Sequence, residues 1–184
     1  MENETSEKRR RGRLKLALLG AFFVLPMVVA WVIWRFELAP GAAGNYGTLL
    51  SPQPVPIPAL AALKGKWVLV QLDGGACVAA CERKHYFMRQ VRRAQGREMM
   101  RVERLWLVTD AAPPPPALLA AIEGTVVVGD GVVLAKAFPA ERAASEHIYL
   151  IDPLGNLMMR FPEDPDPARV IKDLKHLLKF SGFG

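Results

Sequence analysis

An uninterrupted apolar run lies near the N-terminus of this chain. From Leu16 to Trp34 no side chain is charged. A helix over this run would be roughly 28 Å long at about 1.5 Å per residue, which is close to the thickness of the hydrocarbon core of a bilayer. The run is longer than the apolar part of a typical secretory signal peptide, and no clear Ala-x-Ala cleavage site follows it. We therefore predict a transmembrane helix over residues 16–35, with a cleaved signal peptide as the alternative.

The charges on either side of this run indicate its orientation. Only Arg35 and Glu37 follow it before a long uncharged stretch, whereas basic residues crowd the segment before it. Because basic flanks stay in the cytoplasm, we expect residues 1–15 to form a cytoplasmic tail and the rest of the chain to be exported. In a bacterium this is a single-pass inner-membrane protein with a periplasmic domain, and the helix would contact membrane lipid. The basic residues before the run are Lys8, Arg9, Arg10, Arg11, Arg13 and Lys15.

The net charge of +6 does not indicate nucleic-acid binding. About half of it lies in residues 1–15, where the membrane topology explains it. No basic stripe interleaved with aromatic residues follows, as a nucleic-acid surface would require. We therefore predict no nucleic-acid partner.

The remaining chain predicts a spacer followed by one α/β domain. Residues 36–59 are rich in proline, glycine and alanine, and alternating prolines favour an extended backbone. We interpret this segment as a linker, with an arm packed on the domain surface as the alternative. In residues 60–184, short apolar runs alternate with helical patterns, which indicates a partly parallel sheet covered on both faces. The predicted strands cover 67–72, 105–108, 125–128, 147–151 and 156–161, and the predicted helices cover 77–93, 116–122, 132–138 and 166–180.

The two cysteines, Cys77 and Cys81, form the candidate site. They follow a Gly-Gly turn after the first predicted strand, where a helix is expected to begin. Residues four apart on a helix lie about 6 Å apart at Cα, within the range of a disulfide. Two thiolates also bind Cu(I), and an imidazole can complete such a site. A redox-active pair, a soft-metal site, a structural disulfide and two buried small side chains all stay open. His85 lies one turn further and is interpreted as a packed or solvated helix residue, with a metal ligand as the alternative if the helix is irregular there.

The position of the cysteine pair is typical of the thioredoxin superfamily, in which the pair begins the helix after the first core strand. Thioredoxins separate their cysteines by two residues, whereas the spacing Cys77-Val-Ala-Ala-Cys81 resembles that of the Sco/SenC copper chaperones. This resemblance implies a thioredoxin-like domain that binds Cu(I) and serves cytochrome oxidase assembly. Further segments that are similar to that family, in the same order along the chain, are 63–70, 107–110, 134–138 and 149–155.

The resemblance also implies a histidine ligand. In the Sco/SenC family this histidine lies five residues before the tyrosine that corresponds to Tyr149, a position occupied by Ala144 here. The proline that usually follows the second cysteine is replaced by Glu82. His147 lies two residues before Tyr149, near the place where thioredoxins have a cis-proline that faces their cysteines. If this register holds, we expect His147 to join the two cysteines as a copper ligand, with an ordinary strand-edge histidine as the alternative.

Three functions are compatible with these residues. The first is a membrane-anchored copper metallochaperone or assembly factor that passes Cu(I) to an oxidase subunit. The second is an enzyme, a thiol-disulfide oxidoreductase in which Cys77 attacks another thiol protein and Cys81 resolves the mixed disulfide. The third is a non-catalytic assembly scaffold that keeps the thioredoxin-like fold and holds partner proteins through its surface and its membrane anchor.

Overall fold

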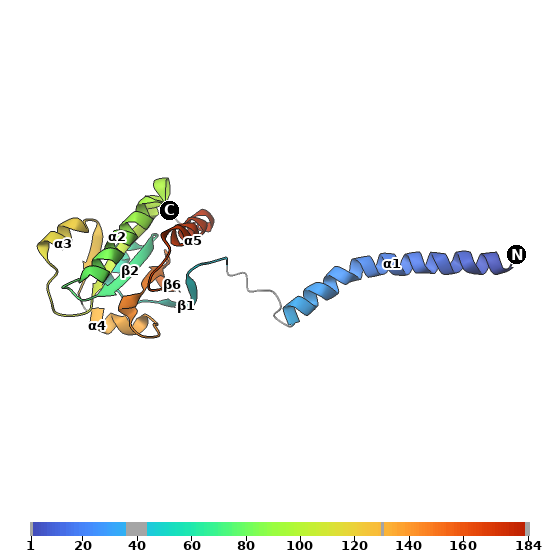
Figure 1. The fold of residues 1–184 in the computed structure, drawn as a ribbon, viewed down its shortest axis with the longest axis horizontal. Helices are drawn as coiled ribbons and strands as arrows, with labels where there is room; N and C mark the ends of the chain where they lie inside the picture. Colours follow the sequence, from blue (N-terminus) through green and yellow to red (C-terminus); the bar gives the residue numbers. More distant parts are fainter. Residues whose placement is uncertain (1, 36–43, 130, 183–184) are drawn as a thin grey trace. The chain divides into compact units, whose positions relative to one another are not determined.

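The computed structural model describes residues 2–35, 44–129 and 131–182, and the chain divides into two compact units, Met1–Ala43 and Gly44–Gly184. The first unit contains one helix, α1 (Glu2–Arg35) (Figure 1). Most of the large apolar side chains that are described on α1 are exposed. Among the residues that the structure describes, no helix is long and apolar enough to cross a membrane. A membrane-spanning role for residues 16–35 stays a prediction.

The second unit contains a mixed sheet of six strands in the order β1-β6-β5-β2-β3-β4. β2, β3 and β4 run parallel to one another, β5 is antiparallel to β2, and β6 is antiparallel to both β5 and β1. The predicted α/β class is therefore confirmed. The strands are β1 (Thr48–Pro54), β2 (Trp67–Asp73), β3 (Val102–Val108), β4 (Thr125–Val128), β5 (Ile148–Ile151) and β6 (Asn156–Arg160).

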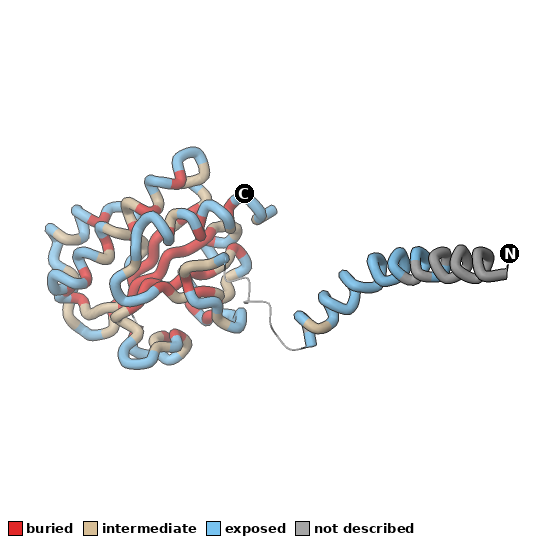
Figure 2. Tube along the Cα trace, turned by 45° about the vertical axis from the view of Figure 1, so that its right-hand side comes forward, coloured by how far each residue is buried: buried red, intermediate tan, exposed pale blue. Residues whose placement is uncertain are grey.

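Helical segments cover both faces of this sheet, and the buried residues concentrate in the strands between them (Figure 2). One face packs against α2 and α5, and the other against α4 and η1. The helices are α2 (Ala79–Arg93), α3 (Pro116–Ala121), α4 (Gly131–Leu134) and α5 (Pro167–Phe180), and the 3₁₀ helices are η1 (Pro58–Leu63), η2 (Gly96–Arg101), η3 (Ala135–Ala137) and η4 (Ala144–Glu146).

The central strand β2 shows why these residues form a sheet. Its residues from Trp67 to Leu72 are all buried, and alternate side chains enter opposite cores. Val68 and Val70 pack on the α4 side, whereas Leu69 packs on the α2 side. A strand that is buried on both faces has a continuous rather than an alternating apolar sequence.

The strand β1 lies within the segment predicted to be a linker. Residues 48–54 pair with β6 at the edge of the sheet, where Pro52 is tolerated because one side of an edge strand has no neighbour to receive its hydrogen bonds. The segment before β1 is tied down as well. The buried carboxylate of Asp173 on α5 accepts hydrogen bonds from the backbone N–H groups of Tyr46 and Gly47, each at 2.8 Å. The second unit thus begins well before residue 60.

Candidate functional site

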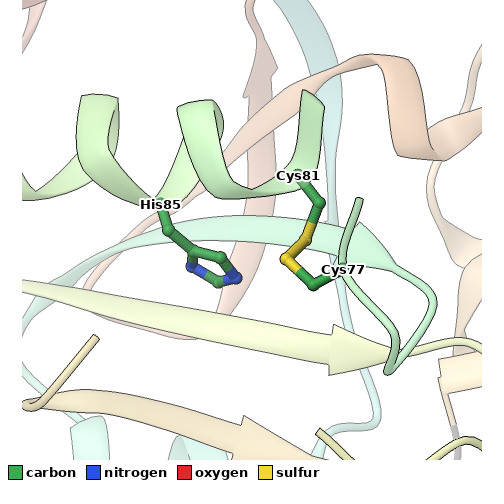
Figure 3. A group of neighbouring side chains, drawn as sticks. All are labelled: Cys77, Cys81 and His85. Atoms are coloured by element: carbon green, nitrogen blue, oxygen red, sulfur yellow. A yellow bond between two sulfur atoms is a disulfide. The ribbon is translucent and has the colours of Figure 1, made fainter. Parts of the chain in front are cut away.

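The two cysteines lie in the loop that joins β2 to α2. The backbone N–H of Cys77 donates to the carbonyl oxygen of Gly74 at 3.1 Å, and Cys77 has a left-handed backbone with φ of 43°. α2 begins only at Ala79, so Cys81 lies in its first turn and Cys77 precedes it. The predicted helix over 77–93 is confirmed from Ala79 to Arg93, but its start at Cys77 is wrong, because a residue with a left-handed backbone cannot belong to the helix. A disulfide joins the two residues, whose Cα atoms are 5.1 Å apart (Figure 3).

Asp110, after the end of β3, holds the turn that precedes the cysteines. Its Oδ1 accepts hydrogen bonds from the backbone N–H groups of Gly75, at 2.7 Å, and Ala112, at 3.1 Å. A side chain at Gly75 would collide with the carbonyl oxygen of Ala112. A glycine at position 75 and an acceptor at position 110 therefore fix the path of the backbone into the cysteine pair.

His85 lies next to the disulfide, on the following turn of α2 (Figure 3). Its side-chain nitrogens and the two sulfur atoms form a group in which one ligand atom from each residue lies within 4.8 Å of the others. The ring is 2% exposed and packs edge-on against Trp106, with the ring centres 4.8 Å apart. Neither ring nitrogen has a hydrogen-bond partner among the described residues. His85 is therefore packed, as the sequence interpretation favoured, and it also lies in the candidate metal group, the alternative that its spacing of four residues from Cys81 left open.

The imidazole of His85 is held in its neutral form. Burial, together with the nearby charges of Arg104 and Lys84, lowers its pKa from 6.5 to about 4. At neutral pH the ring therefore keeps a lone pair on one nitrogen and a proton on the other. Since both nitrogens are buried without partners, that lone pair is available to a ligand between the ring and the sulfur atoms.

The surrounding residues fix α2 against the sheet. The side-chain amide of Gln71 on β2 donates to the carbonyl oxygen of Cys81 at 3.2 Å. The ammonium group of Lys84 pairs with Asp73 at 3.3 Å and also donates to the carbonyl oxygen of Ser145. These contacts hold α2 against β2 and against η4, and so fix the position of the helix that carries Cys81 and His85.

His147, the predicted third ligand, directly precedes β5. It is buried, and its Nδ1 lies 2.9 Å from the carbonyl oxygen of Phe161, so a proton on Nδ1 donates to that oxygen. The group formed by Cys77, Cys81 and His85 does not include it. The structure thus brings the two predicted cysteines together, and the role of His147 as a ligand stays a prediction.

This arrangement supports two kinds of chemistry. An external thiolate can attack the disulfide, which frees one cysteine as a thiol and leaves the other in a mixed disulfide with the reductant. A second thiol of the reductant then attacks the mixed disulfide, which releases the second cysteine and leaves the reductant as a disulfide. After reduction the pair offers two soft sulfur ligands with a neutral imidazole beside them, a set suited to Cu(I). The residues present therefore fit a soft metal ion as well as thiol exchange.

Comparison with known proteins agrees with this fold. The model of a family described as "Transmembrane-like, thioredoxin-like, C-terminal domain" matches residues 67–181. No curated protein matches the chain. The matched residues include the whole cysteine site and every strand except β1.

Solved structures with a similar fold include copper-bound Sco1 from yeast. That protein is 14% identical over 74% of this chain and 94% of its own, with a TM-score of 0.56. A second crystal structure of yeast Sco1 is 13% identical over 74% of this chain and 99% of its own, with a TM-score of 0.53. An electron transfer protein, described as putative, from Aquifex aeolicus is 16% identical over 65% of this chain and 84% of its own, with a TM-score of 0.50. At these identities the likeness establishes a shared fold, and the predicted thioredoxin-like architecture with Sco/SenC resemblance is confirmed.

Proposed function

The chain belongs to the family of transmembrane-like, thioredoxin-like C-terminal domains, and from this premise we propose that it is a membrane-anchored copper chaperone. In its reduced form Cys77 and Cys81 bind Cu(I), with His85 as the nitrogen donor beside them. The ion is the cargo, and an oxidase subunit is the proposed recipient, as the resemblance to the Sco/SenC family suggests.

The observation that carries this proposal is the unpaired imidazole of His85. A buried polar group without a hydrogen bond reduces the free energy of unfolding by about 1–3 kcal/mol. Such a group is expected where a bound ligand supplies the missing partner. Here one ring nitrogen of His85 and the sulfur atoms of Cys77 and Cys81 lie within 4.8 Å of one another. A metal ion bound between them would use the free lone pair of the ring and both sulfurs at once.

The protonation states favour Cu(I) once the disulfide is reduced. Because the pKa of His85 is lowered to about 4, the ring needs to lose no proton before it binds a cation at neutral pH. Reduction by an external dithiol transfers two electrons and two protons to the cysteines, and the disulfide forms in the reductant. Copper binding then displaces the thiol protons, which leave to solvent.

The anchor is proposed from the sequence and from the exposed side chains of α1. Residues 16–34 carry no charge and follow a basic segment, which places the tail inside and the domain on the exported side of a cytoplasmic membrane. Along α1 the apolar side chains of Phe22, Phe23 and Met27 are each more than 60% exposed, so they need an apolar environment outside their own unit. In this proposal a lipid bilayer supplies it along residues 16–35 of the helix.

Titration of the reduced full chain with Cu(I), in competition with a chromophoric Cu(I) chelator, tests this proposal. We expect one tightly held ion per chain, lost in Cys77→Ser and in Cys81→Ser, and held roughly tenfold or more weakly by His85→Ala. His176→Ala changes an exposed histidine on α5 and serves as the matched control. Unchanged binding in both cysteine variants would sink the chaperone function.

The variant His147→Ala decides which histidine completes the site. If His85 is the ligand, Cu(I) affinity stays within about twofold of the parent when His147 is replaced. If His147→Ala loses Cu(I) affinity and His85→Ala keeps it, the third ligand is His147. The unpaired imidazole of His85 would then no longer support the proposal.

The disulfide itself favours thiol-disulfide exchange as a second candidate function. In this function Cys77 attacks a disulfide of a partner protein and Cys81 releases the product. A Cys81→Ser chain should then accumulate a mixed disulfide with its partner, while Cys77→Ser should not. If neither variant traps a partner and the pair shows no reversible reduction potential, thiol exchange is excluded.

A further inference from the structure

A pocket of about 400 Å³ lies between α2, α3 and β3, next to the cysteine site. His85 lines it, and two of its apolar residues, Leu118 and Ile122, also pack in the cluster that contains Cys77 and Cys81. Whatever occupies the pocket therefore meets the same imidazole that faces the sulfur atoms. The volume lies in the range of sites for small organic molecules.

The polar wall of this pocket carries a buried arginine with unused hydrogen-bond donors. Arg104 on β3 is 4% exposed, and its Nη2 donates to the carbonyl oxygen of Glu123 at 2.7 Å. Among the described residues its Nε and Nη1 have no acceptor. A buried guanidinium with two unpaired nitrogens is costly, and acceptor oxygens from a ligand would satisfy it.

The positive charge of Arg104 is also not paired with a negative charge in the described part of the chain. Within 4 Å no carboxylate among the described residues pairs with Arg104 or with Arg89, which lines the same pocket from α2. The neighbouring Glu103 pairs instead with Lys66, at 2.8 Å, and with Arg92, at 3.7 Å. The only carboxylate in the lining, as far as the structure describes it, is the exposed Glu82. The lining therefore has a net charge of one positive unit, which matches one negative charge on a ligand.

The opposite wall is apolar. It consists of Pro115, Ala117, Leu118, Ala121 and Ile122, contributed by α3 and the residues beside it. A ligand that fits both walls has one anionic group for the arginines and an apolar body for α3. A carboxylate on a short hydrocarbon chain has this composition, whereas a phosphate carries more charge and no apolar body.

We propose that this pocket binds a carboxylate with an apolar body, either as a free organic acid or as an acidic side chain of a bound peptide. The carboxylate oxygens accept hydrogen bonds from Arg104 and Arg89, and the hydrocarbon part lies on α3. The pocket shares His85 with the proposed copper site, but it is present in the oxidised chain without metal.

Calorimetric titration of the oxidised, metal-free full chain in mild detergent tests this. The ligands are hexanoate, its uncharged amide hexanamide, inorganic phosphate, and the blocked peptide acetyl-Ala-Glu-Ala-amide. We expect saturable binding of hexanoate or of the peptide, with the stronger of the two identifying the source of the carboxylate. Hexanamide enters detergent micelles more readily than hexanoate, so it controls for partitioning and should give no saturable heat.

Two pairs of variants locate the binding. Arg89→Gln should weaken it at least fivefold, whereas Arg93→Gln, an exposed arginine on α2 outside the pocket, should leave it within twofold. Ala117→Phe should fill the pocket and abolish binding with all arginines kept, whereas Ala120→Phe, exposed on the same short helix, should not.

Several results would overturn the carboxylate site. They are the absence of saturable binding by both carboxylates, equal binding of hexanamide, binding of phosphate in place of hexanoate, or equal effects of the two variants in either pair. Because the chain is oxidised and holds no copper, each of these results is independent of whether the reduced cysteines bind Cu(I).

Discussion

His85 is the residue at which stability and the proposed function oppose each other. Replacing it by leucine keeps an apolar side chain of similar size in the buried site and removes two ring nitrogens that lack partners. Removing these unpaired nitrogens should raise the free energy of unfolding by about 1–3 kcal/mol. Loss of the edge-on contact with Trp106 should lower it by about 0.5–1.5 kcal/mol. We therefore expect His85→Leu to stabilise the oxidised, metal-free chain by about 1 kcal/mol at pH 8 while it weakens Cu(I) binding after reduction.

The same substitution should change how stability depends on pH. The pKa of His85 is about 4 in the folded chain, against 6.5 in the unfolded chain. Between pH 6.5 and pH 4 the His85 imidazole is protonated in the unfolded state but stays neutral in the folded state. The free energy of unfolding therefore decreases as the pH falls, until the pH approaches 4. From these two values the loss contributed by His85 between pH 8 and pH 4 is about 3 kcal/mol. A leucine does not titrate, so His85→Leu should lack this part of the acid sensitivity.

Urea unfolding of the oxidised full chain, followed by circular dichroism at pH 8, 6, 5 and 4, measures both effects. His176→Leu removes an exposed histidine from α5 and is the control, because its acid sensitivity should equal that of the parent chain. Two results would refute the reasoning. One is a destabilisation of more than about 1 kcal/mol at pH 8, which would mean that His85 has a structural partner. The other is a difference in stability between pH 8 and pH 4 that is as large in His85→Leu as in the parent chain.

Three further substitutions test the surroundings of the site and the start of the second unit. Asp110→Ala removes the acceptor for the N–H of Gly75; it should cost about 1–3 kcal/mol in urea unfolding and speed reduction of the disulfide by dithiothreitol. Gly75→Ala should cost a similar 1–3 kcal/mol, because the added methyl group meets a carbonyl oxygen of the neighbouring loop, and equal stability would contradict this close approach. Asp173→Ala leaves the N–H groups of Tyr46 and Gly47 without their acceptor; we expect a loss of about 3 kcal/mol in urea unfolding and faster amide hydrogen exchange in β1.

The central strands could be predicted because burial on both faces leaves a continuous apolar sequence. The runs at 67–72, 105–108 and 147–151 each correspond to a strand in the structure, with boundaries that differ by a few residues. The edge strand β1 could not be predicted in this way. Its prolines also suit an extended linker, and only pairing with β6, about a hundred residues later in the sequence, makes the segment a strand.

The site was predicted in part. Spacing alone brought Cys77 and Cys81 together, because residues this close on a turn and a helix start can always meet. The left-handed backbone of Cys77 could not be predicted, since it depends on the contact between Gly75 and Asp110 across two strands. Nor does the sequence say that the ring of His85 lacks hydrogen-bond partners, because that follows from the side chains that surround it in the fold.

In the part of the chain that the structure describes, several of the buried polar atoms without partners in the second unit lie in one region, whereas Trp67 Nε1, Gln95 Oε1 and Thr125 Oγ1 lack partners outside it. Gln71 Oε1, both nitrogens of His85, Arg89 Nε, and Nε and Nη1 of Arg104 are buried without partners among the described residues. Gln71 and His85 lie beside the cysteines, and His85 joins Arg89 and Arg104 in the lining of one pocket.

Each unpaired buried group disfavours the folded state, so a group of them around one site is expected where ligands supply the missing partners. The cysteine pair and the arginine pocket then share His85 as a common wall, so a substitution of this residue should disturb both kinds of binding, whereas substitutions of Cys77 or Arg89 should each disturb only one.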